Sequence, residues 1–146
     1  ITPEELMQLA IEACREGIEA GQSPFGCAIA MGDQVVAQVH NTVTLTTDIT
    51  AQAEVNAIRP ARLAGGHISG AGAAVATGGH WARVETVYYG ATIADAEEAG
   101  FNELSLPAAE LLRLGQSKVK LVAGTLADDC RQLFDQWNAN PQRTPY

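Results

Sequence analysis

Segments with strand-like and helical patterning alternate along most of this chain, and this alternation constrains its fold more than any other feature of the sequence. An N-terminal helix is followed by two strand-like runs, Cys27–Met31 and Gln34–His40, joined by a tight turn at Gly32-Asp33. A helix within Asp48–Ala61 comes next, and further strands and helices then follow in turn. Because connections through helices leave successive strands parallel, the sequence predicts an α/β fold, a three-layer α/β/α sandwich around a five-stranded mixed sheet.

One stretch breaks this alternation. Ala71–Gly79 consists almost wholly of small residues, where a buried strand would carry larger apolar side chains. We therefore expect a weak and mobile segment there. Beyond it, we expect a helix at Pro107–Leu114, a strand at Lys118–Ala123 and a final helix ending near Trp137.

Length and charge bound the classes of function. A chain of 146 residues suits a single domain, 1–146, with residues 138–146 as a C-terminal tail. Nine basic against seventeen acidic side chains give a net charge of −8, which disfavours a nucleic-acid-binding surface and favours a small-molecule ligand. There is no apolar run of membrane-spanning length and no leader-like N-terminus, so we expect a cytoplasmic protein without membrane contact.

Glu54 is the strongest candidate for chemistry. Thr50 is the expected N-cap of its helix and Pro60 the expected exit, which places Glu54 in the first turn. A carboxylate there either stabilises the helix start, through unpaired amides and the helix dipole, or moves protons. These residues alone leave both interpretations open.

The surroundings of Glu54 resemble a known family. Zinc-dependent base deaminases carry His-x-Glu at a helix start, and Gln52-Ala53-Glu54 matches that motif with glutamine in place of the metal-binding histidine. Pro24-Phe25-Gly26 before the first strand and His40-Asn41 after the second are also similar. The chain thus resembles the cytidine deaminase superfamily, most closely its guanine deaminase-like and cytosine deaminase-like branch.

The resemblance implies a set of site residues. Glu54 would be the catalytic proton shuttle, and Asn41, Phe25, Gln52 and Tyr146 would bind a base-like small molecule. In such relatives the C-terminal tail crosses onto a partner subunit, so a homodimer is implied as well. Glu103 also matches an acidic position of that pocket, although a solvated loop carboxylate is the better interpretation from the residues alone.

The zinc ligands of the family are missing. Pro-Cys-x-x-Cys is absent, and the segment between Ser69 and Trp81 is shorter than the family pattern, without the start of the helix that carries those cysteines. Cys14, Cys27 and Cys130 lie far apart, as buried hydrophobic residues do. A catalytic zinc site needs three protein ligands, and the Gln52 amide is a poor substitute for imidazole. We therefore expect no metal and no cofactor, although zinc is the metal of the family.

Three hypotheses for function stay open. The first is a zinc-free enzyme in which Glu54 is an acid/base on a nucleobase-like heterocycle. The reaction would not be hydrolytic deamination, because Glu54 alone supplies only roughly two to four decades of rate and that reaction needs more. The second is a non-catalytic binding module or partner subunit. The third, suggested by the composition of Ala71–Gly79, is an engineered or truncated zinc-less form of a nucleobase deaminase.

Overall fold

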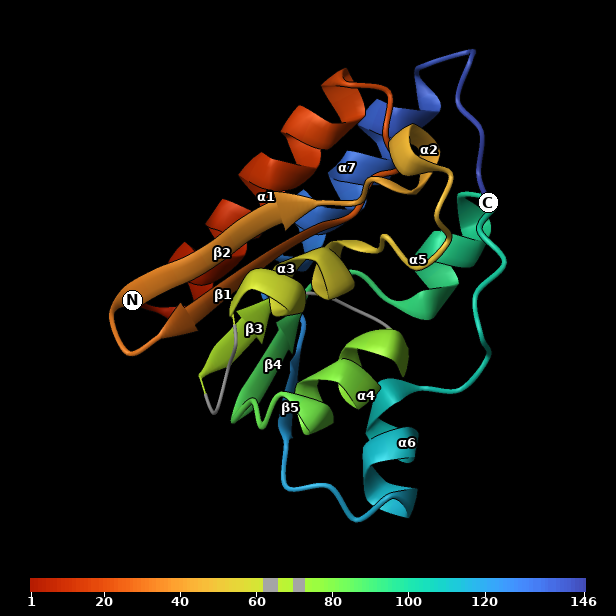
Figure 1. The fold of residues 1–146 in the computed structure, drawn as a ribbon. Coiled ribbons are helices and arrows are strands. Elements are labelled where there is room, and N and C mark those ends of the chain that lie inside the picture. Colours follow the sequence, from red (N-terminus) through yellow and green to blue (C-terminus); the bar gives the residue numbers. More distant parts are fainter. Residues whose placement is uncertain (62–65, 70–72) are drawn as a thin grey trace.

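The computed structural model describes residues 1–61, 66–69 and 73–146, and Figure 1 shows a sheet with helices on both faces. The sheet has five strands in the order β2-β1-β3-β4-β5. β1 is antiparallel to both β2 and β3, whereas β3, β4 and β5 are mutually parallel. The predicted five-stranded mixed sheet is confirmed. Its strands are β1 (Gly26–Met31), β2 (Gln34–His40), β3 (His67–Ser69), β4 (Thr86–Tyr89) and β5 (Lys120–Ala123).

Seven helices of the described residues surround the sheet. The first begins with a capping box, in which Thr2 Oγ1 accepts a hydrogen bond from the Glu5 backbone N–H at 3.1 Å and the Glu5 carboxylate accepts one from the Thr2 N–H at 2.7 Å. The helices are α1 (Pro3–Glu19), α2 (Val43–Thr46), α3 (Ala53–Ala61), α4 (Ala73–Trp81), α5 (Ile93–Glu98), α6 (Ala108–Leu114) and α7 (Ala127–Asn138). Among the described residues, we find no helix with the length and apolar character needed to cross a membrane.

Two apolar clusters separate the layers. One lies between the sheet and the pair α1 and α7, which run side by side on one face (Figure 1), and it includes Leu6, Ile11, Leu133 and Phe134. The other lies on the opposite face under α3 and includes Ile29 and Ile68 of the sheet, both fully buried. Helices packed on both faces confirm the three-layer α/β/α arrangement.

The described part of the alanine- and glycine-rich stretch is a helix, so the expectation that the start of this helix is missing was wrong, whereas the expectation of a weak and mobile segment stays a prediction. The nine residues of α4 run from Ala73 to Trp81. Alanine has the highest helix propensity of all residues. Glycine also lets α3 and α4 approach closely, because a Cβ on Gly78 would lie only 2.8 Å from Cδ1 of Ile58. Residues 71 and 72 of the stretch lie outside the described residues.

The start of α3 also differs from expectation. Thr50 is not its N-cap, because the Thr50 hydroxyl donates to Asp48 Oδ1 at 2.6 Å and the helix begins only at Ala53. The first intrahelical hydrogen bond runs from the Asn56 N–H to the Gln52 carbonyl oxygen, at 2.9 Å. Gln52 therefore occupies the position before the first turn. Pro60 lies inside the helix, one residue before its end, rather than beyond it.

Candidate functional site

Glu54 is a buried carboxylic acid at the start of α3. Its side chain is 8% exposed, and the ion pairs found among the described residues do not include it. Burial raises the pKa of Glu54 from 4.5 to about 7. The nearby charge of Glu103 raises this pKa further, whereas the hydrogen bond from the backbone N–H of Glu54 lowers it. A carboxyl group with this pKa exchanges its proton readily near neutral pH.

A cavity of about 90 Å³ opens in front of Glu54. Phe25 and its neighbours in the turn before β1 form one wall, and the segment from Gly90 to Ile93 after β4 forms another. Glu54, Glu103 and the exposed Thr92 supply the polar side chains among the described lining residues. The remainder is apolar, so the site offers an acid pair in a largely apolar enclosure.

Glu103 lies in this cavity, contrary to the interpretation as a solvated loop carboxylate. Its side chain is half-buried, and burial raises its pKa, with a further increase from the charge of Glu97. The position of Glu103 was hard to predict, because it stands in an irregular segment between α5 and α6, where no periodicity indicates which side chains turn inward.

Asn41, Gln52 and Tyr146 form a hydrogen-bonded triad, although they come from three distant parts of the chain. The Asn41 side-chain amide donates to the Tyr146 hydroxyl oxygen at 2.7 Å and to Gln52 Oε1 at 3.2 Å. The Tyr146 hydroxyl in turn donates to Gln52 Oε1 at 2.6 Å. Asn41 is fully buried, and its own Oδ1 accepts from the Val43 N–H at 3.0 Å. Three of the five predicted site residues thus contact one another. The described lining of the cavity includes the other two, Phe25 and Glu54.

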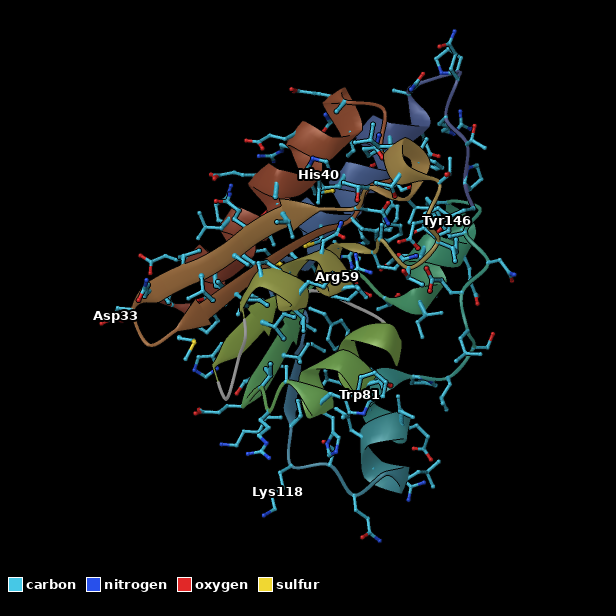
Figure 2. All side chains as sticks on the ribbon, viewed as in Figure 1. Asp33, His40, Arg59, Trp81, Lys118 and Tyr146 are labelled. Carbon is cyan, nitrogen blue, oxygen red and sulfur yellow. The ribbon has the colours of Figure 1, made fainter. Side chains whose placement is uncertain are left out.

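The C-terminal tail packs on its own chain to complete this triad, whereas the resemblance implied that it crosses onto a partner subunit. Figure 2 labels Tyr146 beside α5, and its ring lies 5.4 Å from the ring of Phe101 at a steep angle. Arg143 lies over the ring of Trp137, 5.7 Å from its centroid. Burial raises the pKa of Tyr146, so its hydroxyl stays protonated and remains a donor to Gln52.

Phe25 connects the triad to the cavity. Its carbonyl oxygen accepts a hydrogen bond from the Asn41 N–H at 3.0 Å, while its ring packs edge-to-face on Phe101 at 4.9 Å and on Phe134 at 5.9 Å. Such pairs contribute roughly 0.5–1.5 kcal/mol beyond their buried area. The wall of the cavity at Phe25 is therefore held from several sides.

Asn56 is a positioning residue that the sequence analysis missed. Its side-chain amide donates to the His40 carbonyl oxygen at 3.1 Å, to Thr42 Oγ1 at 2.9 Å and to the Ala51 carbonyl oxygen at 3.2 Å. These contacts hold the segment that carries Asn41 against the segment that precedes Glu54. Asparagine is unfavourable inside a helix, and its presence two residues after Glu54 was the available signal.

The donor groups that the structure describes do not fit a zinc ion. Gln52 Oε1 already accepts from Asn41 and Tyr146, and the Gln52 amide donates to the Ile49 carbonyl oxygen at 2.8 Å. Burial, together with the charge of Glu54, raises the pKa of the Cys27 thiol well above its usual value, which disfavours the thiolate that zinc needs. Within the described part of the chain no three His, Cys, Asp or Glu side chains are grouped to hold a metal.

Comparisons with known proteins agree with the resemblance drawn from the motifs. Residues 1–89 match the model of the family described as the cytidine and deoxycytidylate deaminase zinc-binding region. Over 111 residues the chain is 35% identical to guanine deaminase of Bacillus subtilis (strain 168), an alignment that covers 68% of this chain and 71% of that protein.

Solved structures share the fold. The guanine deaminase from Nitrosomonas europaea superposes with a TM-score of 0.84 at 22% identity, over 95% of this chain and 86% of that one. A mutant of the protein NE0047, crystallised with 8-azaguanine, also has a TM-score of 0.84 at 22% identity, with 94% and 85% of the two chains covered.

Proposed function

The chain belongs to the cytidine and deoxycytidylate deaminase family, with guanine deaminase-like relatives, and from this premise we propose that it binds a nucleobase-like heterocycle with Glu54 as its proton-transferring group. The proposed chemistry is zinc-free acid/base catalysis on a small molecule. No hydrolytic step through a metal is proposed, since the described donors do not fit one.

The observation that carries this proposal is the buried carboxyl group of Glu54 at the cavity wall, which takes part in none of the ion pairs found among the described residues. Removing a carboxylate from water without a partner is costly, so such groups concentrate at functional sites. With a pKa of about 7, Glu54 either donates or accepts a proton at neutral pH. The edge of a nucleobase offers ring nitrogens and N–H groups, which suit both states of a carboxyl group.

Charge favours a free base over a nucleotide as the ligand. The cavity lining includes Glu54 and Glu103, and no lysine, arginine or histidine is found among its described residues. A phosphate group would therefore meet like charges without a compensating cation. The complex of the NE0047 mutant with 8-azaguanine, a base analogue, supports the same class of ligand.

Each site residue has a proposed role. Phe25 is a flat apolar wall on which a planar ring packs, and Glu54 holds or moves the proton at the ring edge. Asn41, Gln52 and Tyr146 join the segments around the site through their hydrogen bonds. Proton transfer of this kind suits isomerisation, elimination or cyclisation, with a contribution of roughly two to four decades of rate from the acid/base group.

Calorimetry with guanine, hypoxanthine and cytosine tests the proposal. We expect the wild-type chain to bind at least one of these bases at pH 7, and we expect Glu54→Gln to weaken that binding at least tenfold and to abolish any turnover while circular dichroism stays unchanged. Glu98→Gln, which changes an exposed side chain of α5, is the matched control and should behave as the wild type. Undiminished binding and turnover in a folded Glu54→Gln variant would sink the proposal.

A non-catalytic binding module or partner subunit is the second candidate function, favoured by the lack of a fitting metal donor set among the described residues. A bound base that stays chemically unchanged after prolonged incubation, together with co-purification of an active homologue, would support this candidate. An engineered or truncated zinc-less deaminase is the third, and comparison of the intact mass with the mass of the native gene product tests it.

We also propose a homodimer of single-domain chains in the cytoplasm, on the family resemblance. Trp81 and Leu45 are 79% and 72% exposed, and both are large apolar side chains of the kind that association buries. Light scattering on the full chain is expected to give twice the mass of one chain, and the mass of one chain at micromolar concentration would count against the dimer.

A further inference from the structure

The cavity has two chemically different ends. Glu54 and Glu103 form a polar end, next to the exposed Thr92. The other end is closed by buried side chains from two helices, Met7, Ala10, Ile11 and Cys14 of α1 and Leu133 and Phe134 of α7. The lining thus combines Glu54, at the start of α3, with side chains of α1 and α7, the two helices that lie side by side on the other face of the sheet (Figure 1).

Two glycines line the cavity beside the ends of strands. Gly26 begins β1 and Gly90 follows β4, and both line the cavity. A Cβ on Gly26 would lie 2.1 Å from the Ala10 carbonyl oxygen, and one on Gly90 would lie 2.3 Å from Cys130 Sγ. α1 and α7 thus approach the backbone closely at these two points, so no side chain larger than the hydrogen of glycine fits there.

The described side chains of the deep end include no amide, hydroxyl or charged group that could pair with a polar atom of a ligand. Its described side chains are aliphatic, aromatic or sulfur-containing, with Cys130 Sγ 3.8 Å from Met7 Sδ. Burial raises the pKa of the Cys14 and Cys130 thiols, which therefore stay neutral. An amino or carbonyl group placed there would lose its hydrogen bonds to water without replacement, whereas an alkyl or thioether group would not.

From this arrangement we propose that the deep end is a subsite for a compact apolar substituent, so that the preferred ligand is a base with a methyl, ethyl or methylthio group pointing away from the edge that meets Glu54. This inference rests on the proposed function. A volume of about 90 Å³ corresponds to roughly six to nine buried waters at about 10–15 Å³ each, so only a compact ligand fits. Each buried methylene is expected to tighten binding about fourfold.

Calorimetry with purine and its 2-, 6- and 8-methyl derivatives tests the subsite on the full chain. At least one methyl derivative should bind about fourfold tighter than purine, and its ethyl analogue should bind tighter still. Ala96→Leu, which fills the cavity from α5, should abolish this gain while purine itself still binds. Ala82→Leu, at a buried alanine of the opposite cluster, is the matched control and should keep the gain.

Leu133→Ala provides a second readout if Ala96→Leu does not fold, since a larger deep end should shift the preference from methyl to ethyl or propyl derivatives. If purine binds and none of its methyl derivatives binds more tightly, the subsite is overturned. The proposed function then still stands. A gain that survives in folded Ala96→Leu would overturn it as well. No binding of purine or of any derivative would instead refute the proposed function, and the subsite with it.

Discussion

Replacing Glu54 by glutamine is expected to stabilise the protein at neutral and alkaline pH while it removes the proposed activity. In the folded chain the carboxyl group of Glu54 is buried without an ion-pair partner among the described residues, whereas in the unfolded chain water surrounds it. The folded state therefore holds the proton more tightly than the unfolded state. Glutamine has nearly the same shape and carries no charge, so it avoids the cost of ionising the buried group.

The magnitude follows from the pKa. Burial raises the pKa of Glu54 from 4.5 to about 7, and each pH unit between these values corresponds to about 1.4 kcal/mol, which gives about 3–4 kcal/mol in total. Between pH 4.5 and 7 the folded chain binds more protons than the unfolded chain, so the contribution of Glu54 to the free energy of unfolding falls as the pH rises. Above pH 7 both states have lost the proton, and the difference is constant.

Urea unfolding of the wild type and of Glu54→Gln, at half-unit steps from pH 4 to pH 8.5, measures this difference. The advantage of Glu54→Gln should grow from pH 4.5 to pH 7 and then level off at about 3–4 kcal/mol. Other titrating groups are common to both chains and largely cancel, although the coupled Glu103 changes with Glu54, and Glu98→Gln at an exposed side chain of α5 is the matched control. A constant difference between the two unfolding curves across this pH range would refute the reasoning.

Three further predictions concern the frame of the site. Tyr146→Phe removes the hydroxyl that donates to Gln52, so the free energy of unfolding should fall by about 1 kcal/mol and carboxypeptidase should cleave the tail faster. An unchanged cleavage rate would contradict this prediction. Gly90→Ala places a Cβ 2.3 Å from Cys130 Sγ and should lower the free energy of unfolding in urea by about 2 kcal/mol, part of which should return when Cys130→Ala is added. An unchanged unfolding midpoint would refute this steric explanation. Asn56→Ala removes three hydrogen bonds and should cost about 2–3 kcal/mol, and a loss below 0.5 kcal/mol would show that they contribute little.

Features that depend on neighbouring residues could be predicted from the sequence. The capping box of Thr2 and Glu5 spans only three residues, and β2 has the predicted bounds, Gln34 to His40, because a tight turn and alternating burial define a hairpin locally. The mixed sheet followed from the order of elements. The burial of Glu54 in the first turn of α3 was consistent with the motif that surrounds it.

Features that depend on long-range packing could not be predicted in the same way. The stretch that contains α4 reads as a poor strand, yet its helix is favoured by alanine and by the close approach of Gly78 to Ile58. The triad of Asn41, Gln52 and Tyr146 joins positions up to 105 residues apart, so only the family resemblance had grouped them. The apolar end of the cavity arises where α1 and α7 meet, and no local pattern marks it.

Native mass spectrometry of the intact chain, purified from zinc-supplemented medium and mixed with the tightest-binding base, tests the central claim most directly. The account predicts a complex of one base per chain without zinc, which is lost in Glu54→Gln. One zinc ion on every chain, with base bound only to the zinc-containing species, would contradict the account.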